Sequence, residues 1–254
     1  MKLRVISMFL IFSIAALSGG CGKKGVSIGK GDPSEEFKEC LRLSTKGNFE
    51  DSIQCFEMFK ARYPQTPEGQ EAELRIGDAQ FKKKEYLLAA ESYRAFLRLH
   101  PTHPKADYAH YRAGVSYFKE SPKAIDRDQG YLDDAIGELR TVLRRYPSSA
   151  YADLSRATLR VALLRIAKRS YYIGNFYFKR GEYIAAIPRF REVAADFPDS
   201  GLADISLYKI VEAEIKLGRL DDAKIAFGDL SVKYPGSKYT KKAEAKLLRA
   251  AKKK

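Results

Sequence analysis

Proline recurs in this chain at the end of successive amphipathic segments, each time directly after an aromatic residue or a histidine. The five pairs are Tyr63-Pro64, His100-Pro101, Tyr146-Pro147, Phe197-Pro198 and Tyr234-Pro235. From one proline to the next, the spacings are 37, 46, 51 and 37 residues. A period in the thirties that closes on proline is typical of stacked helical hairpins, which form an elongated α-solenoid. The repeat therefore predicts a binding function, because solenoids of this kind present extended surfaces to peptides or proteins.

When the segments are aligned on their closing prolines, they fit the 34-residue tetratricopeptide pattern. Gly77, Gly114 and Gly174 occupy the position where that pattern requires a small residue, because two helices cross there. Apolar residues follow at spacings of three, four and seven, as in amphipathic helices. The sequence predicts an all-α protein with five tetratricopeptide-like hairpins over residues 33–240 and a basic helix or tail over residues 241–254.

Two of the intervals exceed 37 residues, and each excess locates an interruption of the repeat. The first excess is nine residues, 121–129, which we expect to form a loop between the two helices of the third repeat. The second adds fourteen residues, about four helical turns, to a segment in which only Gly174 weakens a helix. We therefore expect a first helix of about 28 residues in the fourth repeat. Pro188 falls inside the second helix of that repeat and should bend it.

The N-terminus has the parts of an export signal. Lys2 and Arg4 precede an apolar run that ends at Leu17, and small residues follow up to Cys21. The run is shorter than the roughly 20 residues that span a bilayer. We therefore expect residues 1–20 to be a removed signal peptide.

Cys21 directly after small residues resembles the bacterial lipobox, in which the cysteine is acylated and becomes the new N-terminus. The match departs from the usual pattern in one respect, since Leu17 lies four residues before the cysteine rather than three. The resemblance implies a lipid attached to Cys21 and a flexible tether over residues 21–32. Gly22 in place of aspartate implies transport to the outer membrane.

Two further cysteines, Cys40 and Cys55, fall on the paired helices of the first hairpin. They lie about one helical turn out of the register in which paired helices of the repeat usually pack, whereas a disulfide requires Cα atoms closer than about 7 Å. Two buried thiols are the expectation, with a disulfide as the alternative.

Positive charge is concentrated at the C-terminus. The chain has a net charge of +14, and residues 233–254 carry nine Lys or Arg against one Glu. A basic segment of this kind indicates an acidic partner or anionic lipid headgroups, or else a solubilising cap on the last repeat. An exported protein rarely meets nucleic acid, so we expect no nucleic-acid partner.

The most distinctive motifs surround the third and fourth repeats. These are His100-Pro101-Thr102-His103-Pro104, Asp107-Tyr108-Ala109-His110-Tyr111, Asp126-Arg127-Asp128-Gln129, residues 144–152 and Arg180-Gly181-Glu182-Tyr183. Together they resemble the BamD family, also called the ComL family, of lipoproteins in the outer-membrane β-barrel assembly machinery. The resemblance covers roughly residues 35–240, and the Asp126–Gln129 insert is its most specific part. The Lys-rich C-terminus departs from the family.

The resemblance implies two binding regions. The first repeats would form a groove for extended segments of unfolded barrel proteins, notably an aromatic-ended C-terminal strand. The last repeats would bind a POTRA domain of the barrel-forming subunit, and other assembly lipoproteins would join the complex. Arg189 matches the arginine in the region that faces the POTRA domain in the family, with a solvated helix residue as the alternative.

Independently of the resemblance, the first helices of the early hairpins place aromatic, aliphatic and lysine side chains at groove-facing positions. The residues are Phe37, Leu41, Leu74, Phe81, Lys82, Tyr108, Tyr111, Phe118 and Lys119. An aromatic groove edged by lysines suits an aromatic side chain beside a terminal carboxylate. The alternative is that many of these residues are buried against the adjacent repeat.

Catalysis has little support in the sequence. His100, His103 and His110 lie in a turn and the helix after it, without the neighbours that a metal site needs. Asp126 and Asp128 flank an arginine, as in an ion-paired loop or a helix cap. We expect no enzyme activity, no cofactor and no metal.

Two other functions remain open. One is a periplasmic tetratricopeptide scaffold that coordinates cell-wall synthesis or division, although such scaffolds typically begin with a coiled coil. The other is a competence-related, peptidoglycan-associated lipoprotein.

Overall fold

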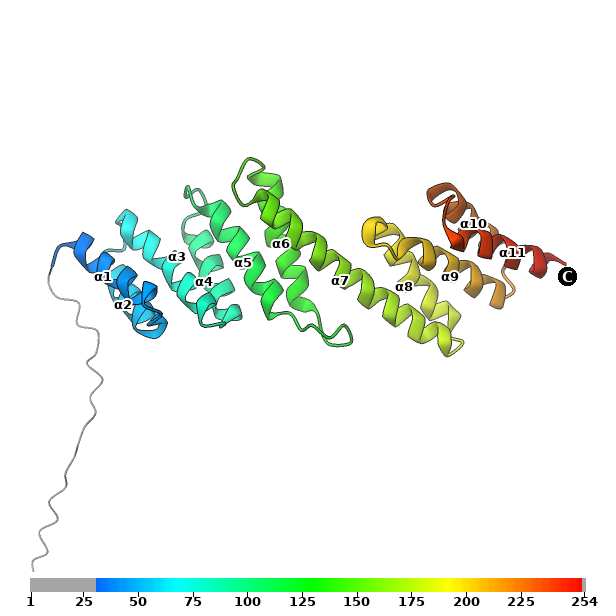
Figure 1. Ribbon diagram of the computed structural model, residues 1–254, viewed down its shortest axis with the longest axis horizontal. Coiled ribbons are helices and arrows are strands. Elements are labelled where there is room, and N and C mark those ends of the chain that lie inside the picture. Colours follow the sequence, from blue (N-terminus) through cyan, green and yellow to red (C-terminus); the bar gives the residue numbers. More distant parts are fainter. Residues whose placement is uncertain (1–30, 253–254) are drawn as a thin grey trace, which may run out of the picture.

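The computed structural model describes residues 31–252, which form helices and connecting turns without a strand. Successive helices stack side by side into an elongated body, with α1 and α11 at opposite ends (Figure 1). The predicted all-α solenoid is confirmed. The helices are α1 (Pro33–Thr45), α2 (Phe49–Arg62), α3 (Pro67–Lys82), α4 (Tyr86–Leu99), α5 (Ala106–Glu120), α6 (Gly130–Arg145), α7 (Ala152–Lys179), α8 (Tyr183–Asp196), the 3₁₀-helix η1 (Pro198–Ser200), α9 (Ala203–Lys216), α10 (Leu220–Lys233) and α11 (Lys238–Ala251).

Each aromatic-proline or histidine-proline pair ends the second helix of a hairpin. The residue before the proline is the C-cap of α2, α4, α6, α8 and α10, with φ between −126° and −136°. Proline disfavours the helical conformation in the residue that precedes it, because its ring crowds that residue's backbone. The prolines therefore stop these five helices and set the length of each hairpin.

Glycine lies where the helices of a hairpin approach most closely, as the repeat pattern predicted. A Cβ atom on Gly77 would lie 2.9 Å from the Tyr93 ring, and one on Gly114 would lie 2.8 Å from Leu139 Cγ. On Gly174 it would lie 3.0 Å from the ring of Phe190. Each glycine therefore leaves room for a bulky residue of the partner helix to interlock.

Both predicted interruptions of the repeat are confirmed. Residues 121–129 form the loop between α5 and α6, and α7 is a single helix of 28 residues. The first half of α7 packs on α6 through Leu159 and Ala162, whereas Tyr171 and Tyr177 in its second half pack against the C-terminal core. The long helix therefore joins two groups of hairpins (Figure 1).

The prediction of two free thiols was wrong, because Cys40 and Cys55 form a disulfide between α1 and α2. Their Cα atoms are 5.3 Å apart, and both residues are fully buried. Beside the disulfide, the hydroxyl of the buried Ser52 donates a hydrogen bond to the carbonyl oxygen of Cys40 at 3.2 Å.

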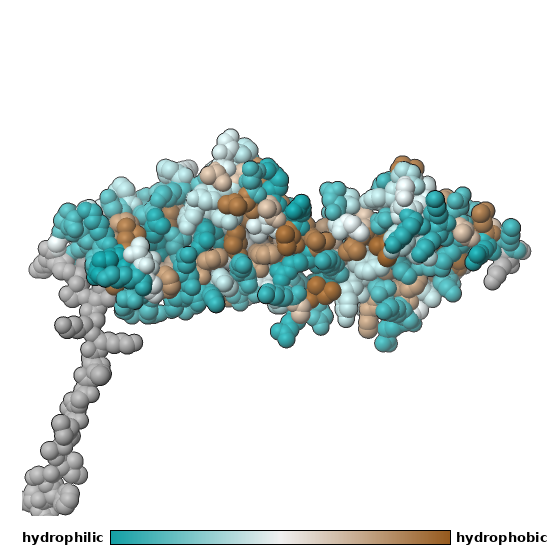
Figure 2. All heavy atoms as spheres, in the orientation of Figure 1, coloured by the Kyte–Doolittle hydropathy of each residue, from teal (hydrophilic) through white to brown (hydrophobic). Residues whose placement is uncertain are grey.

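The surface of the long helix exposes large apolar side chains. Leu154, Val161, Tyr172 and Phe176 are each about half exposed, and hydrophobic residues gather over the middle of the molecule along α7 (Figure 2). Within residues 31–252, no helix is both long and apolar enough to span a bilayer. The expected signal peptide, Cys21 and most of the tether lie outside the described residues.

The contact between Gly114 and Leu139 gives a test of the packing. Gly114→Ala should lower the free energy of unfolding by about 1–3 kcal/mol, since its Cβ would clash with Leu139 and would also lie 3.3 Å from the Ala135 carbonyl oxygen. The control is Gly137→Ala on α6, where the new Cβ meets nothing within 4 Å. That variant should gain about 0.5–1 kcal/mol from helix propensity. Urea denaturation of both variants measures the difference, and equal effects would contradict the proposed close approach.

Candidate functional site

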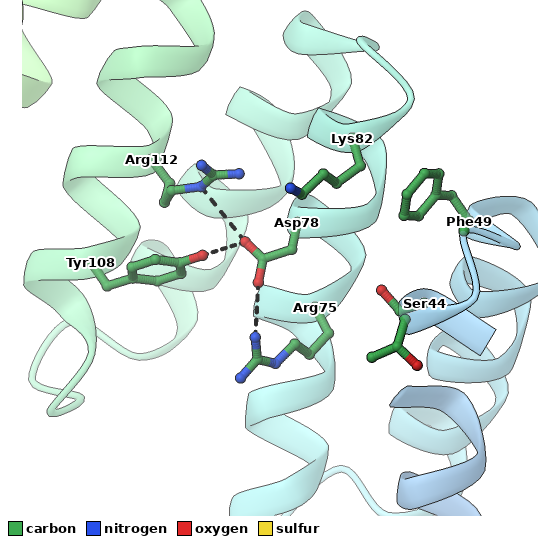
Figure 3. A pocket seen from close by; sticks show the side chains of 9 residues that line it. Ser44, Phe49, Arg75, Asp78, Lys82, Tyr108 and Arg112 are labelled. Atoms are coloured by element: carbon green, nitrogen blue, oxygen red, sulfur yellow. Dashed lines mark hydrogen bonds and ion pairs between the residues drawn. The ribbon is translucent and has the colours of Figure 1, made fainter. Parts of the chain in front are cut away.

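The N-terminal repeats form an open cavity of about 460 Å³. It lies between the turn that joins α1 to α2 and the neighbouring faces of α3 and α5 (Figure 3). Its lining combines three cationic side chains and one carboxylate with two aromatic rings. The lining residues are Ser44, Thr45, Gly47, Phe49, Arg75, Asp78, Lys82, Tyr108 and Arg112.

Asp78 is the centre of a hydrogen-bond network at this cavity. Its Oδ1 accepts hydrogen bonds from the Tyr93 hydroxyl, at 2.6 Å, and from the Tyr108 hydroxyl. Its Oδ2 accepts from Arg75 at 3.2 Å, and Arg112 Nε lies 3.6 Å from Oδ1 (Figure 3). Three helices, α3, α4 and α5, are thus joined through a single carboxylate.

The electrostatics of the network keep both tyrosines protonated and both arginines charged. Burial raises the pKa of Tyr93 and of Tyr108, and the adjacent Asp78 carboxylate raises each further. Burial alone would lower the pKa of Arg112, but the two tyrosines and the carboxylate outweigh it and the pKa is raised. Arg112 also lies 4.0 Å above the Phe81 ring, in a cation–π contact.

The cavity retains an excess of positive charge. Asp78 is the single carboxylate among its lining residues, against Arg75, Lys82 and Arg112. Arg75 also pairs with Glu71 at 2.6 Å, so the excess charge comes mainly from Lys82. Lys82 is exposed and points towards the same space (Figure 3). The buried Nε of Arg75 has no hydrogen-bond partner among the described residues. The arrangement can therefore bind an anionic group while Phe49 and Tyr108 contact an apolar or aromatic side chain.

The structure separates the predicted groove residues into three groups. Lys82 and Tyr108 line the cavity, and Phe81 lies under Arg112 at its edge. Leu74 does not face the groove as expected. It is 1% exposed and packs in a core between α3, α4 and α5, so it cannot contact a ligand. The remaining residues lie apart from the cavity, packed on neighbouring cores or, for Lys119, exposed at the end of α5: Phe37, Leu41, Tyr111, Phe118 and Lys119.

In the insert loop, Gln129 is the residue that determines the conformation. It is 2% exposed, and its side-chain amide donates hydrogen bonds to the carbonyl oxygens of Pro122 and Ala124 at 3.1 and 3.0 Å. Asp128 precedes the N-cap Gln129, and its Oδ1 accepts a hydrogen bond from the Gly130 N–H at 3.2 Å. Asp126 and Arg127 are exposed at the tip.

The C-terminal repeats present a second groove, of about 470 Å³, between α8, α9 and α10. Glu214 lines it and is buried, with an Oε2 atom that lacks a hydrogen-bond donor and lies 3.9 Å from Arg219. Burial and the neighbouring Asp222 raise the pKa of Glu214. Two arginines, Arg219 and Arg191, oppose this shift without reversing it.

Arg189, the predicted interface residue, is half exposed on α8 and pairs with Glu192 at 3.3 Å. Glu192 in turn accepts a hydrogen bond from Ser170 of α7 at 2.7 Å. The guanidinium is therefore oriented by α7 and remains accessible to a partner.

The three histidines serve local contacts. His110 lies 2.6 Å from Glu138, and His100 lies 3.3 Å from Glu73. His103 accepts from the backbone N–H of Lys105. Among the described residues, no cluster of His, Cys, Asp or Glu has the arrangement of a metal site.

A sequence model of a family described as outer membrane lipoprotein, YfiO, matches residues 30–226. Several curated relatives carry the name outer membrane protein assembly factor BamD. The protein of Caulobacter vibrioides is 28% identical over 194 residues, covering 76% of this chain. The match spans 63% of that relative, which is less than two thirds of its length. The Vibrio cholerae protein is 27% identical over 87% of this chain and 94% of its own length.

The chain is also similar to solved tetratricopeptide structures. The TPR2AB domain of yeast Sti1 is 15% identical, with a TM-score of 0.43 over 87% of this chain and 84% of that one. A thermophilic TPR protein of Thermus thermophilus is 19% identical, with a TM-score of 0.37 over 87% of this chain and 99% of that one.

The buried Glu214 carboxylate leads to a pH-dependent prediction. Because its folded pKa is raised, Glu214 favours folding at low pH, and this contribution is lost as the pH rises through the folded pKa. Glu214→Gln should therefore increase the free energy of unfolding by about 1–2 kcal/mol at pH 7. The gain should disappear below about pH 4. Asp229→Asn, an exposed change in the same groove, is the control for urea denaturation at both pH values. A destabilised Gln variant at pH 7 would contradict this account.

Proposed function

This chain belongs to the family of outer membrane lipoproteins whose sequence model matches residues 30–226, and we propose that it is a non-catalytic scaffold in the assembly of outer-membrane β-barrel proteins. The observation that carries the proposal is the match to that family over most of the chain. It is supported by relatives from several bacteria that bear the name of an assembly factor. The solenoid with two separate grooves suits a protein that holds partners together.

The lipid anchor is part of this proposal. Cys21 would carry the lipid, and the tether up to residue 32 would connect it to α1 at one end of the solenoid. Several acyl chains on one cysteine hold a protein on a membrane far better than a single chain does. The protein would then work at the periplasmic face of the outer membrane.

The N-terminal cavity would receive the end of an unfolded barrel protein. A C-terminal strand that ends in an aromatic residue brings one carboxylate and one ring into the site. The carboxylate matches Lys82, for which no ion pair is present within the described part of the chain, beside the paired Arg75 and Arg112, and the ring matches Phe49 and Tyr108.

Lys82 allows a test of this role. Lys82→Glu should weaken binding of a short peptide ending in phenylalanine by about five- to tenfold, because an exposed attraction becomes a repulsion. The same peptide with an amidated C-terminus should bind weakly to both proteins. Lys123→Glu, an exposed lysine in the insert loop, is the matched control. Fluorescence anisotropy measures the affinities, and equal binding of the acid and the amide by the wild-type protein would rule out carboxylate recognition.

The C-terminal repeats would bind the POTRA-containing barrel subunit. Arg189 is accessible on α8 and is oriented through Glu192. Ile184 on the same helix and Ile225 on α10 are also exposed, at 64% and 68%. An accessible cation suits an acidic residue of a partner, and the exposed aliphatic side chains of the same repeats suit an apolar part of its surface.

Affinity purification from solubilised envelopes tests the assembly role directly. The wild-type protein should recover the barrel-forming subunit, and Arg189→Glu should reduce that recovery by roughly tenfold or more, as expected for a truncated or reversed charge pair at an interface. Arg98→Glu on α4 is the control, because it makes the same charge change on an exposed helix of the first half. Recovery of division or cell-wall proteins without the barrel subunit would overturn the proposed function.

A further inference from the structure

The basic C-terminal helix has a role that the proposed function leaves open. α11 packs on α9 and α10 through Ala243, Tyr239 and Leu247, which belong to the C-terminal core or lie against it. The helix and its C-cap also carry five exposed cations, here called the α11 stripe. Its residues are Lys238, Lys241, Lys242, Arg249 and Lys252.

The charges of the α11 stripe are not neutralised within the protein. Some exposed helix cations elsewhere pair with a carboxylate one turn earlier, as in Lys38–Glu35, Arg156–Asp153 and Lys224–Asp221. Within residues 31–252, none of the five stripe residues has an ion pair. Glu244, the one carboxylate of α11, forms none with them either. Lys246, at the edge of the packed face, differs because it pairs with Glu212 of α9.

The composition of the stripe bears on whether its anionic partner is an acidic protein surface or a surface of phosphate groups. Protein interfaces are depleted in lysine and enriched in aromatic residues and arginine. The stripe contains four lysines, one arginine and no exposed aromatic side chain. Lysine is a flexible, strongly hydrated point charge, which suits many equivalent phosphates better than one shaped acidic surface. The helix is straight over about 21 Å, long enough to lie across several lipid headgroups.

We propose that the α11 stripe binds the surface of a bilayer that contains anionic phospholipids. Basic residues near such a surface are attracted by its negative potential. Leu248 lies within the stripe and is 60% exposed, so it can enter the boundary between headgroups and acyl chains. The proposal goes beyond the assembly function and does not depend on it.

The position of α11 gives this contact a geometrical consequence. α11 and α1 lie at opposite ends of the elongated body (Figure 1). If Cys21 carries the lipid as proposed above, the two membrane contacts lie at opposite ends of the solenoid. The molecule would then lie along the bilayer rather than extend away from it.

The test uses the chain from residue 21 onward with Cys21→Ser, so that no lipid contributes and every described residue is kept. This protein should co-sediment with vesicles of phosphatidylcholine and phosphatidylglycerol at low salt, and much less with phosphatidylcholine alone. Neutralising the stripe (Lys238, Lys241, Lys242, Arg249 and Lys252, each to Gln) should lower the partition coefficient by roughly tenfold or more. Added salt should weaken binding of the unmodified stripe, since exposed charges are screened within about 10 Å at 0.1 M.

A matched control distinguishes the effect of the stripe from the effect of a lower net charge. It replaces five exposed cations of the first half by Gln, namely Lys46, Arg98, Lys123, Arg140 and Arg144. This control should bind the anionic vesicles nearly as well as the parent protein. Circular dichroism verifies that both quintuple variants stay folded, as expected because neither alters a packed residue. Equal loss of binding in both variants, or no binding by the parent protein, would overturn the proposal, and the latter result would indicate an acidic protein partner instead.

Discussion

The close approach of the two helices within each hairpin is the constraint on which the rest of this structure depends. Gly77, Gly114 and Gly174 leave space for a tyrosine, a leucine and a phenylalanine of the partner helix. The interlocking pairs fix the register of each hairpin, and proline fixes its length. Because each hairpin packs only on its neighbours, these local contacts determine where every groove-facing side chain lies.

Much of this architecture follows from spacing in the sequence. The interval of 37 residues gives the hairpin, and the longer intervals locate the loop at 121–129 and the 28-residue helix α7. These features were predictable because they depend on how many residues separate two helix stops. They do not depend on which side chains meet across the fold.

The contacts between side chains were harder to predict. Asp78 joins Arg75, Tyr93, Tyr108 and Arg112 only after three helices have packed, and the helical period gives no sign of such a network. The average repeat register also does not show which side chains come into contact. Cys40 and Cys55 lie close enough for a disulfide, and Leu74 lies in the core although the average repeat places its position at the groove. In the insert, the Asp-Arg-Asp-Gln motif was recognised as a unit, but burial singles out its glutamine.

The long helix α7 has a consequence for how the two halves of the molecule can vary. Hairpins pack on both of its halves, so its residue count sets both the distance and the rotation between the two grooves. One inserted residue would lengthen the helix by about 1.5 Å but would turn everything beyond it by about 100°. Seven inserted residues would add about 10 Å and nearly restore the original orientation. The effect of an insertion or deletion in α7 therefore depends on how far it rotates the second half of the molecule. Only insertions or deletions close to a whole number of helical turns keep both grooves in their present relative orientation.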